Sequence, residues 1–376
     1  MNFTFWFLIQ NLLIRNNITL RIILTNNYKY RLPAEWEPHH ATWIGWPHNK
    51  SDWPGKFTSI PFVYAEIVKY LSRSEKVHIL IQSTEHKLRA EKVLNSSDVN
   101  LKNVKYFIKK TNRGWLRDSG PFFVKGNDTD SVIDFKFNAW AKYDDYKLDD
   151  KIPQFISNRL KLKRFTAEYN GKQVVLEGGS IDVNGKGILI TTEECLVDQD
   201  IQVRNPELTK QDYFQIFKKY FGINKVIWLG KGIVGDDTHG HVDDICRFVN
   251  DDTVVIAQEK NSSDDNYKTL NENRERLQNI TIQNGARLNI VDLPMPSKII
   301  YKGERLPASY ANFYISNNAV LVPIFNDAKD NIALGLLSEL FNDRKVVGIH
   351  CGDLIWGLGA IHCLTKEQPT AFIKNF

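Results

Sequence analysis

Cys363 lies in a sequence context that suits a reactive thiol. It follows the glycine-containing segment 357–360, and apolar residues flank it on both sides. Glycine lets a backbone approach a ligand closely, and a thiolate is the strongest nucleophile that a side chain offers near neutral pH. Most cysteines are small buried hydrophobes, and we interpret Cys195, Cys246 and Cys351 in that way. We single out Cys363 because its position is in period with three polar clusters upstream.

Two of these clusters are carboxylates on glycine-containing turns. Asp118 belongs to segment 112–121, in which glycine and proline predict a tight turn rather than a helix. A carboxylate on such a turn can point at a cationic ligand, although an ion pair with Arg117 that only organises the turn explains the same residues. Glu177 ends an apolar run and precedes two glycines, which suits either a binding site or an ordinary turn.

The third cluster, residues 235–244, is the densest group of polar side chains in the chain. If residues 239–243 are extended, His239, His241 and Asp243 share one face, because side chains alternate along a strand. Three such groups could bind a divalent metal, as in a zinc or iron hydrolase. His241 and Asp243 could instead serve as a general acid–base and a cation-binding carboxylate, and a purely structural cluster is a third interpretation.

A repeated structural unit would bring these clusters together. The candidate residues recur at intervals of about 60 residues or twice that, which indicates an internal repeat. Four segments share a polar turn, a strand, a hairpin loop and a β-branched strand, and a fifth unit would centre on residues 41–46. Helical periodicity fills the gaps. The predicted repeat segments are 114–124, 177–190, 240–256 and 310–322, and the predicted helices are 62–71, 84–94, 153–160, 209–221, 267–284 and 328–341. Because one unit cannot bury its apolar face alone, we expect about five units to close around a common axis in one domain.

Composition limits the class of protein. The chain has 376 residues, 42% hydrophobic and 25% charged, which is typical of a globular protein. The net charge of +5 is spread without a basic stripe, so we expect no nucleic-acid partner. Four dispersed cysteines without a CxxC pair argue against a disulfide scaffold and for a reducing cytoplasm.

The N-terminal segment 1–31 differs from the rest. Its two apolar runs are shorter than the roughly 18 residues that span a bilayer, and the features of a secretory signal are missing. We therefore expect no membrane association. The prediction is an extension over residues 1–31 that is flexible or outside the fold, followed by a catalytic domain over residues 32–376.

Taken together, the motifs resemble those of the agmatine deiminase and bacterial-type peptidyl-arginine deiminase family of guanidino-group-modifying enzymes. The resemblance runs in order from about residue 32 to the C-terminus. The matching segments are 32–39, 42–47, 115–121, 177–179, 236–238, 240–243, 306–313 and 361–365. It implies an α/β fold, the five-bladed pseudo-symmetric α/β propeller (pentein) of ββαβ repeats.

The resemblance also implies a role for each candidate residue. Cys363 would be the nucleophile and His241 the general acid–base, while Asp118 and Asp243 would grip a guanidinium. Such a cation is planar and charged at neutral pH, with a pKa above roughly 12, and paired carboxylates fit its fork. Glu177 would orient His241 or contact the substrate. The same motifs add Trp115 and Arg117 as substrate contacts.

The implied reaction is hydrolysis of agmatine to N-carbamoylputrescine and ammonia, a step of putrescine and polyamine biosynthesis. It would proceed through a covalent thiouronium on Cys363 and would need water but no cofactor and no metal. The sequence leaves the oligomeric state open, so a homo-oligomer is possible. The alternatives are a deiminase of peptidyl-arginine or another guanidino substrate, an amidinotransferase, a metal-dependent hydrolase, and a non-catalytic propeller that binds ribosomes or other partners.

Two departures from the family pattern bear on the substrate. Agmatine-selective members commonly carry a glycine run and an asparagine where this chain has residues 357–360. His239 stands where an acidic residue is frequent. Both positions lie near the expected chemistry without belonging to it, so they affect substrate identity rather than the class of reaction.

Overall fold

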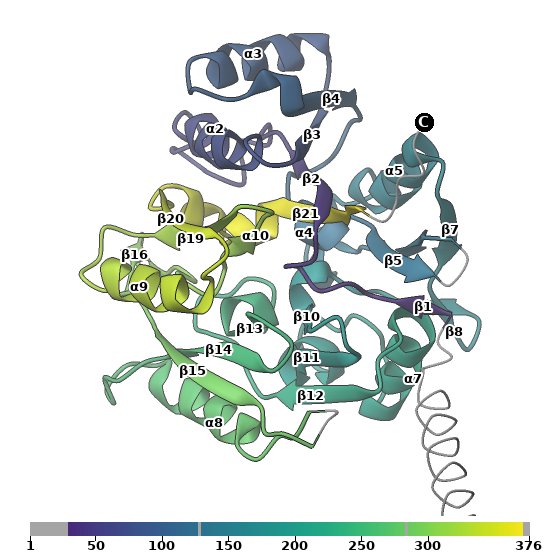
Figure 1. The fold of residues 1–376 in the computed structure, drawn as a ribbon, viewed down its shortest axis with the longest axis vertical. Helices are drawn as coiled ribbons and strands as arrows, with labels where there is room; N and C mark the ends of the chain where they lie inside the picture. The colour runs from purple at the N-terminus through teal and green to yellow at the C-terminus, as the bar shows by residue number, and fades with distance from the viewer. Residues whose placement is uncertain (1–28, 127–128, 283–284, 371–376) are drawn as a thin grey trace, which may run out of the picture.

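The computed structural model describes residues 29–126, 129–282 and 285–370, which form a single α/β domain (Figure 1). Within these residues, five sheets share one strand order. The first strand of the unit pairs antiparallel with the second, through a short hairpin in four of the sheets, and the second pairs parallel with the third. A parallel pair needs a long crossover connection, and helices supply it here. In Figure 1 the sheets lie one after another around the centre of the molecule, and α4 and α10 lie near that centre.

Three of the sheets contain this unit and nothing more. Each has a helix between its second and third strands. The units are β10 (Ile181–Val183), β11 (Ile188–Thr192), α7 (Lys210–Phe221) and β12 (Lys225–Leu229); β13 (Cys246–Phe248), β14 (Thr253–Gln258), α8 (Tyr267–Leu277) and β15 (Asn289–Pro294); and β18 (Tyr314–Ile315), β19 (Ala319–Ile324), α9 (Asp330–Leu340) and β20 (Lys345–His350).

The other two sheets each carry an additional strand. Their elements are β1 (Tyr30–Arg31), β5 (Phe122–Gly126), β6 (Ser131–Asp134), α5 (Ile152–Leu160) and β7 (Lys163–Thr166); and β21 (Thr365–Pro369), β2 (His39–Gly45), α2 (Ile60–Leu71), β3 (Lys76–Ile81), α3 (Thr84–Asn95) and β4 (Val104–Ile108). In the second of these sheets β21 pairs antiparallel with β2, so the two ends of the described chain share one sheet.

Shorter elements connect these units. They are the helices α4 (Leu116–Ser119), α6 (Glu193–Val197) and α10 (Ile361–Leu364), the 3-10 turns η1 (Leu101–Asn103), η2 (Ala139–Ala141), η3 (Asp149–Lys151), η4 (Gly178–Ser180), η5 (Val242–Asp244) and η6 (Leu354–Gly357), and the two-stranded pairs β8 (Glu168–Tyr169) with β9 (Lys172–Gln173) and β16 (Ile300–Tyr301) with β17 (Glu304–Arg305).

All six predicted helices are present, and five have bounds within two residues of the prediction. The helix α7 begins at a capping box of Thr209 with Asp212 and ends at Gly222 in the left-handed conformation. The exception is α8, which ends at Leu277 rather than at residue 284. Asn279 adopts a positive φ of 65°, which stops the helix.

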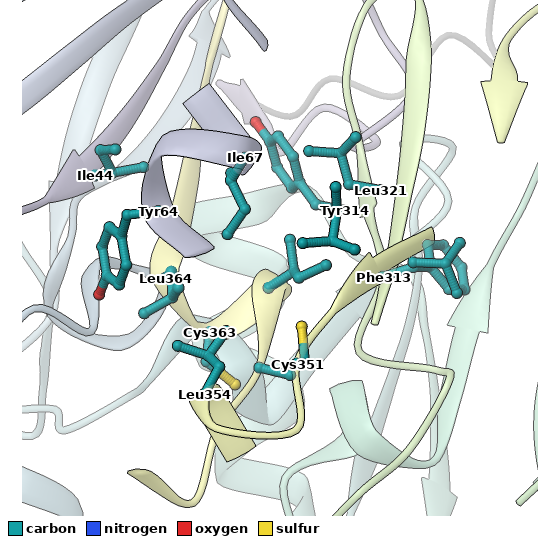
Figure 2. Close-up of a cluster of buried hydrophobic side chains, with 14 of the residues drawn as sticks. Ile44, Tyr64, Ile67, Phe313, Tyr314, Leu321, Cys351, Leu354, Cys363 and Leu364 are labelled. Carbon is teal, nitrogen blue, oxygen red and sulfur yellow. The ribbon is translucent and has the colours of Figure 1, made fainter. Parts of the chain in front are cut away.

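The core consists of aliphatic and aromatic side chains between the sheets and their helices. Figure 2 shows one part of it, where Ile67 of α2 and Leu321 of β19 lie in the same cluster. Cys363 and Leu364 from α10 belong to this cluster as well. The segment that carries the candidate nucleophile is therefore held by packing, which limits its motion.

The fold begins earlier than the predicted boundary at residue 32. Tyr30 and Arg31 form β1 against β5, and Arg31 also pairs with Glu37. The rest of the predicted extension, residues 1–28, lies outside the described residues, as do both of its apolar runs. Among the residues that the structure describes, no helix is long and apolar enough to cross a membrane.

Candidate active site

Each predicted site residue lies just before the first strand of a sheet. Asp118 belongs to α4 before β5, Glu177 precedes η4 and β10, and Cys363 belongs to α10 before β21. His241 and Asp243 flank the start of η5 before β13. The short helix α4 packs against both α10 and η4, and η4 packs against η5. The candidate residues, which recur at regular intervals in the sequence, therefore lie close together in the fold.

The local backbone differs from two predictions. The segment around Asp118 was expected to be a turn, but residues 116–119 form one helical turn whose end is closed by the Gly120 N–H donating to the Leu116 carbonyl at 2.9 Å. The segment 239–243 was expected to be extended, but His239 has a φ of 61° and a 3-10 turn begins at Val242. This backbone does not place His239, His241 and Asp243 on one strand face.

The interactions of His239 also separate it from the site. Its Nε2 lies 2.9 Å from Asp198 Oδ2, whereas Asp243 contacts His362 and Cys363. The alternative in which His239, His241 and Asp243 share a strand face and bind a metal together therefore does not fit this structure.

A cavity of about 400 Å³ lies beside the candidate catalytic residues. Asp118 and Cys363 line it, together with the indole rings of Trp115, Trp140 and Trp356. The cavity is thus lined by a carboxylate, a thiol and flat apolar surfaces.

Gly179 lies against three polar groups of the site. A Cβ atom at this position would lie 2.6 Å from His241 Nδ1, 2.9 Å from Asp118 Oδ1 and 3.0 Å from Asp243 Oδ2. These distances leave no room for a side chain, so glycine lets the two carboxylates and the imidazole approach one another closely. Two carboxylates so close together suit a flat cation that both can contact.

The sulfur of Cys363 has two polar neighbours. Asn312 Nδ2 donates to it at 3.1 Å, and the thiol faces Asp243 Oδ2 at 3.7 Å. Burial raises the pKa of the Cys363 thiol well above its ordinary value, and the charges of Asp243, Asp244 and Asp118 raise it further. Burial and the neighbouring carboxylates therefore favour the protonated thiol.

Asp118 and Asp243, the two carboxylates near His241, have different hydrogen-bond partners. Asp118 accepts from Trp140 Nε1 and from the Gly179 N–H, both at 2.9 Å, and burial raises its pKa. Asp243 Oδ2 lies 2.7 Å from His362 Nδ1, while Asp243 Oδ1 is buried without a hydrogen-bond partner among the described residues. Burial raises the pKa of Asp243, but the contact with His362 outweighs it and the pKa is lowered. A buried oxygen without a partner is available to a ligand.

His241 lies between two carboxylates. Its Nδ1 is 3.8 Å from Asp118 Oδ1, and its Nε2 is 3.9 Å from Glu177 Oε2. Burial lowers the pKa of His241, but Asp118 and the neighbouring Cys195 raise it more, so the pKa lies well above the ordinary histidine value. An imidazolium in this position can donate a proton to a leaving group. Glu177 is itself fixed by Arg204, whose Nε donates to Glu177 Oε1 at 3.0 Å.

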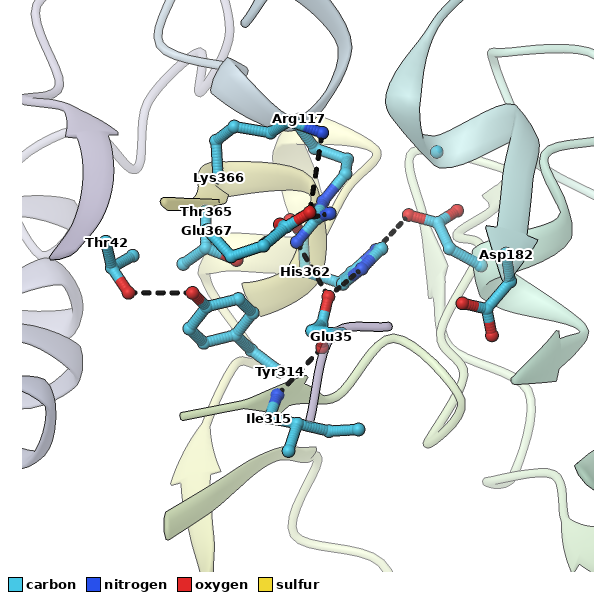
Figure 3. A network of polar contacts seen from close by, with 12 residues as sticks. Glu35, Thr42, Arg117, Asp182, Tyr314, Ile315, His362, Thr365, Lys366 and Glu367 are labelled. Carbon is cyan, nitrogen blue, oxygen red and sulfur yellow. Dashed lines mark hydrogen bonds and ion pairs between the residues drawn. The ribbon is translucent and has the colours of Figure 1, made fainter. Parts of the chain in front are cut away.

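Arg117 is not brought to the cavity. Its guanidinium donates to Glu35 Oε2 at 2.9 Å and to Glu367 Oε2 at 2.7 Å, behind α4 (Figure 3). Glu35 also accepts from Arg247 and lies 2.8 Å from His362 Nε2. This buried network, rather than a substrate, occupies the Arg117 side chain, so the predicted substrate contact is replaced by a positioning role.

Sequence reasoning did not assign several residues that shape the site. Glu35 and Asn312 lie within recognised motifs, and His362 is adjacent to Cys363, so each had a signal in the sequence. Trp140 and Arg204 had none, because they reach the site from loops with no motif of their own. Their roles follow only from the distances.

Comparisons with known proteins agree with this geometry. The model of the Porphyromonas-type peptidyl-arginine deiminase family matches residues 31–369. The agmatine deiminase of Medicago truncatula is 34% identical over 90% of this chain and 96% of its own. The solved structure of the agmatine deiminase of Enterococcus faecalis has a TM-score of 0.81 at 28% identity, covering 91% of this chain and 96% of its own. A C. jejuni agmatine deiminase with a cysteine-to-serine substitution and substrate bound has a TM-score of 0.80 at 30% identity, over 90% of this chain and 96% of its own.

Proposed function

The chain belongs to the Porphyromonas-type peptidyl-arginine deiminase family, and on that premise we propose that it is an agmatine deiminase. As such it is a hydrolase that acts on a C–N bond of a linear amidine and converts agmatine and water into N-carbamoylputrescine and ammonia. The observation that carries this proposal is that Asp118 and Cys363 line one cavity, while Asp243, whose Oδ1 has no hydrogen-bond partner among the described residues, lies 3.7 Å from the Cys363 sulfur.

The proposal includes the arrangement of the whole fold. The five sheets with a common strand order would be the five blades of an α/β propeller, with β2 and β21 closing the ring. Each blade would then present the turn before its first strand to the axis. This explains why the candidate residues recur at a nearly constant interval in the sequence.

Binding would use the two carboxylates. Asp118 and the free oxygen of Asp243 would accept the N–H groups of the guanidinium and hold its plane against Cys363. The cation would also neutralise the carboxylates that raise the pKa of the Cys363 thiol. Substrate binding would therefore favour the thiolate, so that the nucleophile forms only when its target is present.

The first half of the reaction would form a covalent intermediate. The Cys363 thiolate would attack the guanidinium carbon, giving a tetrahedral adduct. The imidazolium of His241 would protonate one nitrogen, and the C–N bond would break to release ammonia. A thiouronium would remain on Cys363, and His241 would be left neutral.

The second half would consume water. Neutral His241 would take a proton from a water molecule as the oxygen attacks the thiouronium carbon. The C–S bond would then break, releasing the ureido product and regenerating the thiol. Glu177 would hold His241 in place from one side, because Arg204 fixes the orientation of its carboxylate.

The cavity favours agmatine over free arginine. The carboxylate of Glu304 lines it and would attract the terminal ammonium of agmatine but repel the carboxylate of arginine, whereas Asp52 and Asp237, which also line it, are paired with Arg113 and Lys142. Two arginines that also line the cavity are paired, Arg113 with Asp52 and Arg305 with Asp264. The methylene chain of the substrate would pack on the indole rings, which is a further role for Trp115.

The test is an ammonia-release assay with agmatine, free arginine and an arginine peptide in parallel. We expect release with agmatine, and loss of release in Cys363→Ser while circular dichroism shows an unchanged fold. Cys351→Ser is the matched control, because Cys351 is buried in the core away from the carboxylates. A Cys363→Ser variant that still releases ammonia would rule out the covalent route.

The outcomes also separate the alternatives. Release with the peptide but not with agmatine would indicate a peptidyl-arginine deiminase. Amidino transfer to an added amine without ammonia would indicate a transferase. The proposal places the enzyme in the cytoplasm, where its small-molecule substrate is present, and leaves a homo-oligomer open to sizing experiments.

A further inference from the structure

A second cluster of reactive groups lies behind the proposed guanidinium site. Cys195, in the short helix α6, is fully buried and is not among the residues that line the cavity. One ligand atom each from Cys195, Glu177 and His241 lie within 4.8 Å of one another. A thiol, a carboxylate and an imidazole thus lie close together, and the proposed deimination does not use the thiol.

Two members of this cluster have free ligand atoms. Glu177 Oε2 and both ring nitrogens of His241 are buried, and none has a hydrogen-bond partner among the residues described. Buried polar atoms are nearly always satisfied, so the unpaired Glu177 Oε2 and His241 Nε2, which lie near each other and near Cys195, indicate a ligand. Sulfur, imidazole nitrogen and carboxylate oxygen are together the ligand set that Zn²⁺ prefers.

The distances fit a tetrahedral ion after small movements. His241 Nε2 and Glu177 Oε2 lie 3.9 Å apart. Bond lengths in tetrahedral zinc sites place a nitrogen and an oxygen ligand roughly 3.3–3.5 Å apart, so these two atoms need to approach by about half an ångström. The Cys195 sulfur lies within 4.8 Å of both and has to move closer as well.

The surrounding residues are arranged as those around a bound metal are. When a ring nitrogen of histidine binds a metal, the other nitrogen usually donates to a carboxylate. His241 Nδ1 lies 3.8 Å from Asp118 Oδ1, on the far side of the ring from Glu177. The other oxygen of Glu177 is held by Arg204 at 3.0 Å, which leaves Oε2 directed at the cluster.

We propose that Glu177, Cys195 and His241 form an inhibitory binding site for Zn²⁺, with water as the fourth ligand. On binding, the Cys195 thiol releases its proton to solvent and no electron is transferred. The bound ion occupies the imidazole that the deimination would need as acid and base. It also places positive charge beside the carboxylates that would hold the guanidinium. Zinc binding itself does not depend on the proposed function, whereas the inhibition rests on it.

The first test measures binding directly. Zinc affinity is determined by competition with a chromophoric chelator, in the Cys363→Ser background so that the proposed nucleophile contributes no thiolate. We expect the further change Cys195→Ala to weaken zinc binding by at least roughly tenfold, as the loss of a ligand does. Cys351→Ala in the same background is the matched control and should bind zinc unchanged. Equal zinc affinity in the Cys195→Ala and control proteins would overturn the proposal.

A spectroscopic measurement identifies the ligand. Co²⁺ replaces Zn²⁺ in such sites and gives a thiolate-to-metal absorption band in the near ultraviolet. The band should be present in Cys363→Ser and absent when Cys195→Ser is added, with both proteins folded by circular dichroism. A band that persists without Cys195, or one that requires Cys363, would assign the metal to a different site.

The second test measures inhibition. Zn²⁺ should lower ammonia release from agmatine, and EDTA should restore it. The half-inhibitory zinc concentration, compared with each variant's own uninhibited rate, should rise at least roughly tenfold in Cys195→Ala and stay unchanged in Cys351→Ala. If the enzyme proves inactive on every guanidino substrate, the chelator and cobalt measurements still decide the metal site.

Discussion

The sulfur of Cys363 is surrounded by groups that oppose its ionisation. Burial and the charges of Asp243, Asp244 and Asp118 all raise the pKa of the thiol, and the hydrogen bond from Asn312 acts in the opposite direction. Asn312 also donates to Asp244 Oδ1 at 3.0 Å, so its amide is fixed in orientation. The site therefore depends on one amide and on the substrate cation to produce a thiolate.

Replacing Asn312→Ala should move the pH dependence of the reaction. Loss of a donor to a thiolate raises the pKa of the thiol, so the ascending limb of kcat/KM should shift to higher pH. A hydrogen bond to a charged group contributes about 1.5–3 kcal/mol, which corresponds to a shift of about one to two pH units. The measurement is the pH profile of ammonia release from agmatine.

The control for this variant lies in the same loop. Ser309→Ala removes the hydroxyl that accepts a hydrogen bond from the Ala311 N–H, but it removes no contact of Cys363. It should leave the ascending limb of the pH profile unshifted. If Asn312→Ala lowered the maximum kcat/KM without shifting the ascending limb of the pH profile, Asn312 would only support the structure of the loop.

Gly179 gives a second prediction for a single residue. An added methyl group in Gly179→Ala would lie within 3.0 Å of Asp118, Asp243 and His241, so these groups would have to move apart. Because displacement of reacting groups by about 1 Å costs on the order of 100-fold in rate, activity should fall by at least that factor while the fold persists. Ammonia release and circular dichroism measure the two effects.

A matched glycine variant separates the site from the backbone. Gly335 lies in α9 with nothing within 4 Å of an added Cβ, so Gly335→Ala should keep full activity and gain about 0.5–1 kcal/mol of stability. Normal turnover by Gly179→Ala would contradict the catalytic roles that we assign to Asp118, Asp243 and His241.

At the scale of elements, the long helices were predictable and the short ones were not. The helices α2 and α3 each span 12 residues, enough for an apolar stripe to reveal the period. The helices α4 and α10, which carry Asp118 and Cys363, have four residues each and show no period. Their form depends on packing against one another, which the sequence does not display. The motifs therefore identified the site residues but not the backbone that presents them.

The network around Glu35 connects these short helices. Glu35 accepts from Arg117 in α4 and from Arg247 in β13, lies beside His362 in α10, and receives the Ile315 N–H at 2.8 Å (Figure 3). Burial raises the pKa of Glu35, but the charges of Arg247, His362 and Arg117 outweigh it and hold the pKa well below the ordinary value. The charged carboxylate thus stabilises the fold.

Replacing Glu35→Gln should destabilise the protein strongly at neutral pH. Removing one partner of a buried ion pair costs about 3–5 kcal/mol, because the remaining charges lose their compensation. Since the folded pKa is depressed, the difference from wild type should be complete above the unfolded pKa and shrink as pH falls through the folded one. Urea unfolding over a pH series measures it. Glu272→Gln, in an exposed pair with Arg276, should cost less than about 1 kcal/mol, and equal costs would contradict the special role of Glu35.

At the scale of the whole molecule, the repeat was predictable because one pattern recurs at a regular interval. The hairpins that begin at Ile181, Cys246 and Tyr314 all appear where the sequence placed them. The contacts of Trp140 with Asp118 and of Arg204 with Glu177 were not predictable, because each joins residues more than 20 positions apart without a shared motif. Such contacts depend on the completed fold.

Ligand binding should therefore stabilise the whole molecule rather than one region. The proposed substrate contacts elements that precede β5, β13 and β21, which belong to three different sheets. In the inactive Cys363→Ser protein, agmatine at 100 times its dissociation constant should add about 2.7 kcal/mol to the free energy of unfolding. Hydrogen exchange should slow in all three sheets together. Adding Asp118→Asn should remove both effects, because it removes one of the two charges that hold the cation. Protection confined to a single sheet, or stabilisation that survives the loss of the Asp118 charge, would mean that the ligand binds elsewhere.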